Sequence, residues 1–168
     1  MKRLLTPVLA PALSLGMALG LLLSLALVAC GSEPPARPQP PYQAMKTEAF
    51  QALVAESQGP LVVAVMSASC SPCIQELPVL DALHRELRGQ GLEVIGLSLD
   101  YSEDNLRHLL EKTGIKFPVY WTGEEAIDPM GIQYLPLLIL YKDGRETGRL
   151  EGLLSEAQLR EAFAALTE

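Results

Sequence analysis

Two cysteines separated by two residues are the part of this chain best suited to chemistry. They are Cys70 and Cys73, in the run Ser69-Cys70-Ser71-Pro72-Cys73. Two thiols at this spacing can form a small disulfide ring and open it again. The loop that they enclose is too short to restrict the unfolded chain much, which disfavours a purely structural disulfide. The motif therefore predicts thiol–disulfide redox chemistry.

Metal binding is the alternative use of these thiols. A structural zinc site needs about four ligands, and the chain has no second cysteine pair. His84 and His108 lie far along the chain and not at ligand spacing, and we predict that both are solvated. Thiolates also suit copper(I), so a copper-binding, metallochaperone-like module stays as an alternative, although no methionines cluster beside the pair. We expect no cofactor.

The cysteines lie between a predicted buried strand and a predicted helix. The run Leu61–Met66 is apolar throughout, which is typical of a central strand with helices on both sides. Apolar residues at three- and four-residue steps then predict an amphipathic helix that begins near Ile74, is kinked by Pro78 and is ended by Gly89 and Gly91. A further helix, capped by Thr47, is predicted before the apolar strand. After the cysteines, strands are predicted at 92–99, 118–121, 137–141 and 146–151, with a hairpin turn at 142–145 between the last two. Ser102 and Ser155 are predicted to cap two more helices.

Residues 1–30 have the composition of an export signal. Lys2 and Arg3 precede a long apolar stretch without charge. The stretch ends in Leu27-Val28-Ala29-Cys30, which resembles a bacterial lipobox, in which the cysteine is lipidated and becomes the first residue of the mature protein. The stretch is also long enough for an uncleaved transmembrane anchor, which needs about 20 residues. We favour the lipoprotein, and both alternatives predict an exported domain tethered to the membrane.

The composition of the remaining chain predicts a tether followed by one domain. Residues 31–41 contain five prolines and almost no apolar side chain, so they form a semi-rigid spacer, and the folded domain covers residues 42–168. The formal net charge of the chain is −7, which argues against nucleic acid as a partner because its phosphates would be repelled. An acidic surface mildly favours a basic or neutral protein partner, but it also needs no partner at all.

The order of these features resembles a thioredoxin fold over residues 42–168. The resemblance implies an α/β domain: a central mixed β-sheet with helices on both faces. Within this fold the chain is similar to the exported, membrane-tethered thiol–disulfide oxidoreductases of the TlpA/ResA type. Residues 100–130 form a helix–strand insertion like theirs, and Glu76 stands three residues after the second cysteine, where that group commonly has a glutamate. Ala64 occupies the place of the buried aspartate of thioredoxin.

The resemblance also implies a role for each site residue. Cys70 is the exposed nucleophile, Cys73 the buried resolving thiol, Glu76 a proton acceptor and Pro136 the cis-proline beside the pair. Physical chemistry supports the role of Cys70, because a helix N-terminus favours the thiolate through the helix dipole and unpaired N–H groups. The site is less aromatic than in those relatives, since Ser69 stands where a tryptophan usually precedes the first cysteine.

These features predict an enzyme that reduces disulfide bonds in exported proteins, with cytochrome c maturation among the tasks of this group. A disulfide-forming oxidase is a further alternative. The residues between the cysteines add no histidine or positive charge to stabilise the thiolate, so we expect a reductant with a potential nearer to that of thioredoxin, about −270 mV, than to that of a strong oxidant. A reductant in this compartment needs electrons from a membrane donor.

We predict that Cys30 carries acyl chains and that the mature protein partitions with membranes. Cys30→Ala should remove the acyl chains because no other thiol lies at the end of the lipobox-like run. Mass spectrometry of the protein extracted from membranes measures both the acyl mass and the first residue. An intact N-terminus at Met1 or Lys2 would instead identify a transmembrane anchor.

Overall fold

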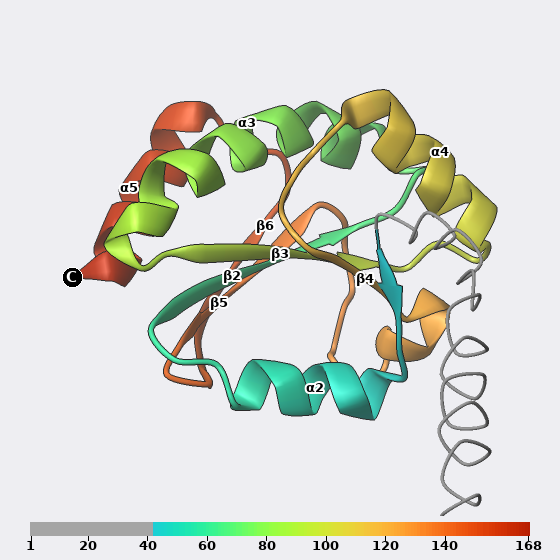
Figure 1. Cartoon of the computed structure of the whole chain (residues 1–168), viewed down its shortest axis with the longest axis horizontal. Coiled ribbons are helices and arrows are strands. Elements are labelled where there is room, and N and C mark those ends of the chain that lie inside the picture. The colour runs from blue at the N-terminus through green and yellow to red at the C-terminus, as the bar shows by residue number, and fades with distance from the viewer. Residues whose placement is uncertain (1–41) are drawn as a thin grey trace, which may run out of the picture. The chain divides into compact units, whose positions relative to one another are not determined.

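The computed structural model describes residues 42–168, and the predicted signal, lipobox and tether lie outside the described residues. The elements in chain order are β1 (Gln43–Ala44), α2 (Thr47–Ala55), β2 (Pro60–Met66), α3 (Ser71–Leu87), β3 (Glu93–Ser98), α4 (Glu103–Thr113), β4 (Val119–Trp121), β5 (Leu137–Lys142), β6 (Arg145–Glu151) and α5 (Glu156–Thr167). Short 3₁₀ helices occupy Arg88–Gln90 and Gly123–Ala126. Figure 1 shows the strands as one central sheet with the helices packed on its two sides.

The sheet is mixed, as predicted, and has β2 and β3 at its centre. Its six strands follow the order β1-β4-β3-β2-β5-β6. The neighbours β1, β4, β3 and β2 run parallel, whereas β5 is antiparallel to β2 and β6 to β5. Because β2 is covered on both faces, its side chains are apolar at successive positions, and all from Leu61 to Met66 are buried.

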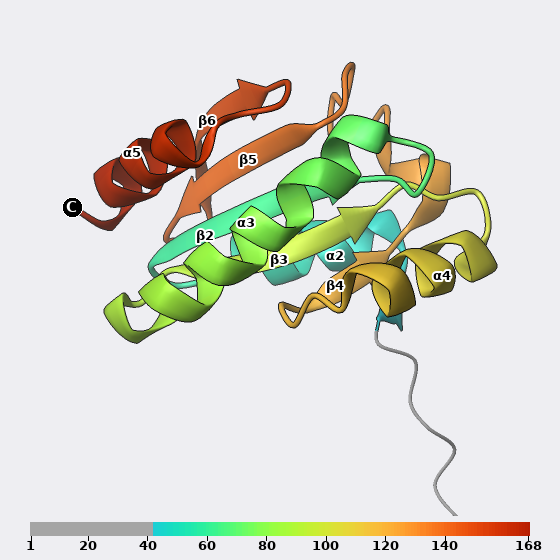
Figure 2. The same ribbon diagram turned by 90° about the horizontal axis from the view of Figure 1, so that it is seen from above.

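Helices cover both faces of the sheet and enclose two separate cores. Helices α3, α4 and α5 lie on one face and α2 on the other (Figures 1 and 2). Val62, Ala64 and Met66 of β2 pack in the first core, with apolar residues of α3, α4 and α5. Val63 and Val65 point to the opposite face and pack in the second core, with apolar residues of α2. The alternation along one strand therefore builds both cores.

Several predicted boundaries hold and others are wrong. Ser102 caps α4, and Ser155 forms a capping box with Gln158 at the start of α5. Helix α2 starts at Thr47 itself, with Lys46 as its N-cap residue. The prediction that α3 begins near Ile74 is wrong, because the helix begins at Ser71 with Cys70 as its N-cap. The first strand, β1, was not predicted, since two residues carry no periodic signal and pair only with the distant β4.

The prediction that His84 is solvated is also wrong. Its side chain is buried on the inner face of α3, where Nδ1 accepts a hydrogen bond of 3.3 Å from the N–H of Val94. Its ring lies edge-on to Phe117, with the centroids 6.3 Å apart. The Val94 N–H of β3 thus gives the buried Nδ1 the hydrogen-bond partner that a buried polar atom requires. His108 is exposed on α4, as predicted.

Helix α3 continues through Pro78, which lies on its exposed side.

In the part of the chain that the structure describes, no helix is both long enough and apolar enough to cross a membrane.

The hairpin between β5 and β6 forms at Asp143-Gly144, as predicted. Both residues have positive φ, 51° and 73°, as a tight turn between twisted strands requires. The Asp143 carboxylate accepts a hydrogen bond of 2.9 Å from the N–H of Gly59, and the Asp143 N–H donates to the carbonyl of the same glycine. The turn thereby packs against the segment that joins α2 to β2.

Gly144→Ala should destabilise the fold strongly. A Cβ at this position would meet the carbonyl oxygen of Ala55, and the backbone already has a positive φ. We expect a loss of about 2–3 kcal/mol in the free energy of unfolding, measured by urea denaturation. Gly148→Ala is the matched control, since a Cβ there meets nothing within 4 Å. Equal stability of the two variants would contradict the close packing of the turn on α2.

Candidate active site

Cys70 and Cys73 form a disulfide at the N-terminus of α3. The sulfurs are 2.03 Å apart and the Cα atoms 5.3 Å apart. Cys70 is half-buried, whereas Cys73 has only 3% of its surface exposed and packs in the core with α3 and α4. The two sulfurs therefore differ in access: a partner's sulfur can approach Cys70 more readily than Cys73.

The start of α3 directs a backbone donor at Cys70. The Cys73 N–H donates a hydrogen bond of 3.2 Å to Cys70 Sγ, so the sulfur itself caps the helix. Pro72 has no N–H, which leaves Ser71 and Cys73 as the first donors of the turn. In the reduced protein these donors and the helix dipole favour a thiolate at Cys70.

The turn before Cys70 is held by Asp100, a residue whose role the sequence did not reveal. Its carboxylate is buried and accepts hydrogen bonds from the Ser67 hydroxyl at 3.0 Å, the Ala68 N–H at 2.8 Å and the Ser98 hydroxyl at 2.9 Å. Because Ser98 is the last residue of β3 and Asp100 lies two residues beyond it, the network ties the end of β3 to the turn that presents Cys70. An acidic residue directly after an apolar strand is the signal that could have identified it.

Glu76 lies on α3 one turn after Cys73 and has only 3% of its surface exposed. Its Oε1 accepts a hydrogen bond of 3.0 Å from the N–H of Leu154. Burial raises the pKa of the Glu76 carboxyl above its ordinary value of 4.5, and the hydrogen bond from Leu154 lowers it to a smaller extent. A carboxyl in this setting exchanges its proton nearer to neutral pH than an exposed glutamate does.

Pro136 lies at the same edge of the sheet as the cysteines, because its neighbour Leu137 pairs with Val65 near the end of β2. The Leu135–Pro136 peptide bond is cis, as the resemblance implies. The Pro136 carbonyl accepts a hydrogen bond of 2.9 Å from the N–H of Gly152. The segment from Gly152 to Leu154 thus connects the cis-proline loop with Glu76 on α3.

Exposed apolar side chains surround this edge of the sheet. The most exposed large ones are Tyr101 at 86%, Tyr134 at 64% and Leu153 at 50%. Tyr101 follows β3, Tyr134 precedes the cis-proline and Leu153 follows β6, so all three lie in loops at the edge that carries the cysteines. Three large apolar side chains are thus open to solvent at the edge of the sheet that carries the cysteines. Sequence reasoning missed these residues, because each is ordinary within its own loop.

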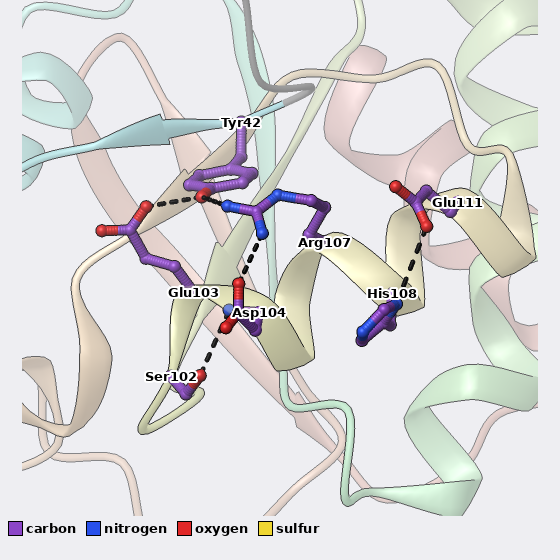
Figure 3. Close-up of polar contacts among 7 residues, drawn as sticks. All are labelled: Tyr42, Ser102, Glu103, Asp104, Arg107, His108 and Glu111. Atoms are coloured by element: carbon purple, nitrogen blue, oxygen red, sulfur yellow. Dashed lines mark hydrogen bonds and ion pairs between the residues drawn. The ribbon is translucent and has the colours of Figure 1, made fainter.

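A polar cluster fixes the inserted helix α4 against the start of the domain. Tyr42 is buried, and its hydroxyl donates a hydrogen bond to Glu103 and accepts one from Arg107 at 3.4 Å (Figure 3). Arg107 also pairs with Asp104. Burial and the bond to Glu103 raise the pKa of the Tyr42 hydroxyl. The insertion is therefore anchored beside β1 at its N-terminal end.

The fold and the site together define a class of protein: a thioredoxin-like domain with a Cys-x-x-Cys disulfide at a helix N-terminus. The sequence model of the AhpC/TSA family matches residues 38–134, and the chain belongs to that family. The expectation of a thioredoxin-like α/β fold is confirmed.

Curated relatives include thiol–disulfide oxidoreductases and a thioredoxin. ResA of Bacillus thuringiensis is 30% identical over 100 residues, which are 58% of this chain and 58% of ResA. Thioredoxin of Pseudomonas aeruginosa is 30% identical over 110 residues, which are 66% of this chain and 82% of that protein. The chain thus spans little more than half the length of the ResA relatives that it matches.

Solved structures with the same fold have lower identity. A thiol:disulfide interchange protein of the thioredoxin family from Chlorobium tepidum has a TM-score of 0.60 and 19% identity, over 70% of this chain and 85% of its own. A secreted Mycobacterium tuberculosis disulfide oxidoreductase homologous to E. coli DsbE has a TM-score of 0.59 and 17% identity, over 67% of this chain and 85% of its own. These structures share the fold with the chain.

Glu76→Gln should stabilise the oxidised protein at neutral pH. The folded-state pKa of Glu76 is raised, so the folded protein binds more protons than the unfolded chain between the two pKa values, and stability falls as the pH rises through that interval. Glutamine removes this loss and can still accept the bond from Leu154. Urea denaturation between pH 4 and 8 should show that the advantage of the variant grows as the pH rises above about 4.5.

Glu86→Gln on the same helix is the control with the opposite sign. The hydrogen bond from Arg160 lowers the pKa of the exposed Glu86 carboxyl, so its contribution is present at neutral pH and is lost as the pH falls through the lowered pKa. A flat difference between Glu76→Gln and the parent protein over this pH range would contradict the burial of an ionisable carboxyl at Glu76.

Proposed function

We propose that this protein is a membrane-tethered thiol–disulfide oxidoreductase that reduces disulfide bonds of exported proteins. The observation that carries the proposal is the asymmetry of the Cys70–Cys73 pair, in which an accessible sulfur at a helix N-terminus is bonded to a buried one. This arrangement suits a nucleophile that a partner can reach and a second thiol that only Cys70 can reach.

The reaction begins with both cysteines reduced. The Cys70 thiolate attacks one sulfur of the partner's disulfide, so a Cys70–partner bond forms and the second partner sulfur leaves as a thiolate. Cys73 then loses its proton and attacks Cys70 Sγ, which releases the first partner sulfur as a thiolate. The partner gains two electrons and takes up protons at both sulfurs. The protein ends with the Cys70–Cys73 disulfide, and an external dithiol must return two electrons to it.

Glu76 is proposed to accept the proton that Cys73 loses. It lies one turn further along α3, on the buried side of the helix, and burial raises the pKa of its carboxyl, which makes it a stronger proton acceptor than an exposed glutamate. Pro136 is proposed to shape the surface on which the partner lies beside Cys70. Its position at the same edge of the sheet and its bond to Gly152 support this role.

The proposed setting is the cell envelope, with the chain held to a membrane through Cys30. The lipobox-like run supports this anchor, and a structural relative is described as secreted. Cytochrome c maturation is one task that the TlpA/ResA likeness suggests, and a membrane protein that supplies electrons would complete the cycle. The exposed Tyr101, Tyr134 and Leu153 support a protein substrate, since they extend the contact surface beyond the two sulfurs.

The roles of the two cysteines are tested by reduction of insulin with dithiothreitol as the electron source. Cys70→Ser should abolish catalysis, because no other accessible thiolate lies at the start of α3. Cys73→Ser should retain attack but lose release, so mixed disulfides with envelope proteins should accumulate and be trapped. Cys30→Ala is the control and should keep full activity. Full activity of Cys70→Ser, or no trapped partner with Cys73→Ser, would contradict the mechanism.

The direction of electron flow is measured on the same purified protein. Equilibration with glutathione or dithiothreitol buffers should give a potential nearer to about −270 mV than to about −120 mV, because Ser71 and Pro72, the residues between the cysteines, add no charge or imidazole that would stabilise the Cys70 thiolate further. A potential near the second value would make the protein an oxidant while leaving the roles of both cysteines unchanged.

A further inference from the structure

A surface hollow lined by Ser69, the residue before the nucleophilic cysteine, lies between the start of α3 and the inserted helix α4. It has a volume of about 350 Å³. Ser69, which precedes Cys70, and Ile74, which follows it by one turn, form one side. Leu109, His108 and Lys112 of α4 form the other side. Any polypeptide whose sulfur reaches Cys70 therefore has this hollow within reach of its neighbouring residues.

The hollow combines an apolar floor with one lysine, Lys112, at its rim. Ile74 and Leu109 both belong to the apolar core beneath it. Lys112 is exposed and, within residues 42–168, takes part in none of the salt bridges. His108 is exposed beside it, with Nδ1 3.7 Å from a carboxylate oxygen of Glu111 (Figure 3). Among the described residues 42–168, no acidic side chain lines the hollow, although the chain as a whole carries a formal charge of −7.

We propose that the hollow selects substrates by binding the segment that flanks the partner's reactive cysteine, with an apolar side chain over Ile74 and a carboxylate at Lys112. This inference rests on the proposed function and adds the substrate's chemistry to it. The occupant is an extended cysteine-containing segment with an apolar and an acidic residue near the sulfur. The net negative charge of the chain does not prevent this contact, because salt screens distant charges over about 10 Å while a direct pair persists.

The same geometry explains why the insertion bears on specificity. Helix α4 supplies the lysine at the rim, and the Tyr42–Glu103–Arg107 cluster anchors its N-terminal turn beside β1. Leu106 and Leu109 bury its apolar side against the core. The rim is therefore held at a fixed place relative to Cys70, as a specificity-determining surface requires.

The test uses the reduced full-length protein and three disulfide reagents that all release the same neutral leaving group, thiopyridone. Two reagents are peptides whose single cysteine is joined by a disulfide to 2-thiopyridine. One peptide has Leu and Glu on both sides of the cysteine, and the other has Leu and Lys there. The third is 2,2′-dithiodipyridine, which has no peptide. Attack by Cys70 forms the Cys70–peptide disulfide and releases thiopyridone, whose absorbance gives the second-order rate constant. Cys73 then releases the peptide thiol.

The parent protein should react about two- to fivefold faster with the acidic peptide than with the basic one, the range expected for one exposed charge pair. Lys112→Glu should abolish or reverse that ratio. Lys142→Glu is the matched control: it makes the same change of charge at the end of β5 that lies away from the cysteines, and it should keep the ratio. All three proteins should react equally with 2,2′-dithiodipyridine.

An equal rate with both peptides, or a ratio that Lys112→Glu leaves unchanged, would overturn the inference while the proposed function stands. Failure of the parent protein to react with 2,2′-dithiodipyridine would overturn the proposed function itself, and the inference with it. The small neutral disulfide therefore separates a fault in the chemistry from a fault in the recognition.

Discussion

The position of the reactive cysteine depends on one buried carboxylate. Asp100, at the end of β3, accepts hydrogen bonds from Ser67, Ala68 and Ser98 and thereby fixes the turn between β2 and α3. Without that acceptor, buried donors would be left unpaired, each at a cost of about 1–3 kcal/mol. Cys70 follows this turn immediately and begins α3, so the orientation of its sulfur toward solvent and toward the Cys73 N–H rests on the Asp100 network.

Glu76 is a second buried carboxyl near the cysteines, and it lies on α3. The strand position at which thioredoxin has its buried aspartate is occupied here by Ala64, which cannot ionise. Glu76 is bonded to the backbone at Leu154, next to the exposed Leu153. The same short segment bonds to the cis-proline loop through Gly152. One loop after β6 therefore contacts both the proposed proton acceptor and the surface where we propose that a partner binds.

The insertion between β3 and β5 adds a helix, α4, and a strand, β4, to the half of the domain that carries the cysteines. Helix α4 packs on the same core as α3, and β4 extends the parallel part of the sheet. Because β2, β3 and β4 are parallel, their carboxyl ends lie at one edge of the sheet. The segments that follow β3 and β4 therefore lie at the same edge as Cys70, which follows β2. Side chains of α4 can thus differ at this surface while the Cys70–Cys73 pair stays fixed at the start of α3.

The sequence by itself determined the features that depend on neighbouring residues. The Cys70–Cys73 spacing, the turn at Asp143-Gly144 and the caps at Ser102 and Ser155 are all local, because each is decided by backbone and side-chain groups within a few residues. The apolar run of β2 also predicted helices on both faces. The likeness to thioredoxins then supplied the cis-proline, which spacing alone could not.

The tertiary structure decided what depends on contacts between distant segments. Ser67 and Asp100 are 33 residues apart and Glu76 and Leu154 are 78 apart, so no local pattern indicates either hydrogen bond. His84 has a polar side chain on a helix, and the Val94 N–H of β3, ten residues away, gives its buried Nδ1 a hydrogen-bond partner. Strand β1 forms because β4 offers it an unpaired edge. Burial and long-range pairing follow from packing, and a single sequence does not encode them residue by residue.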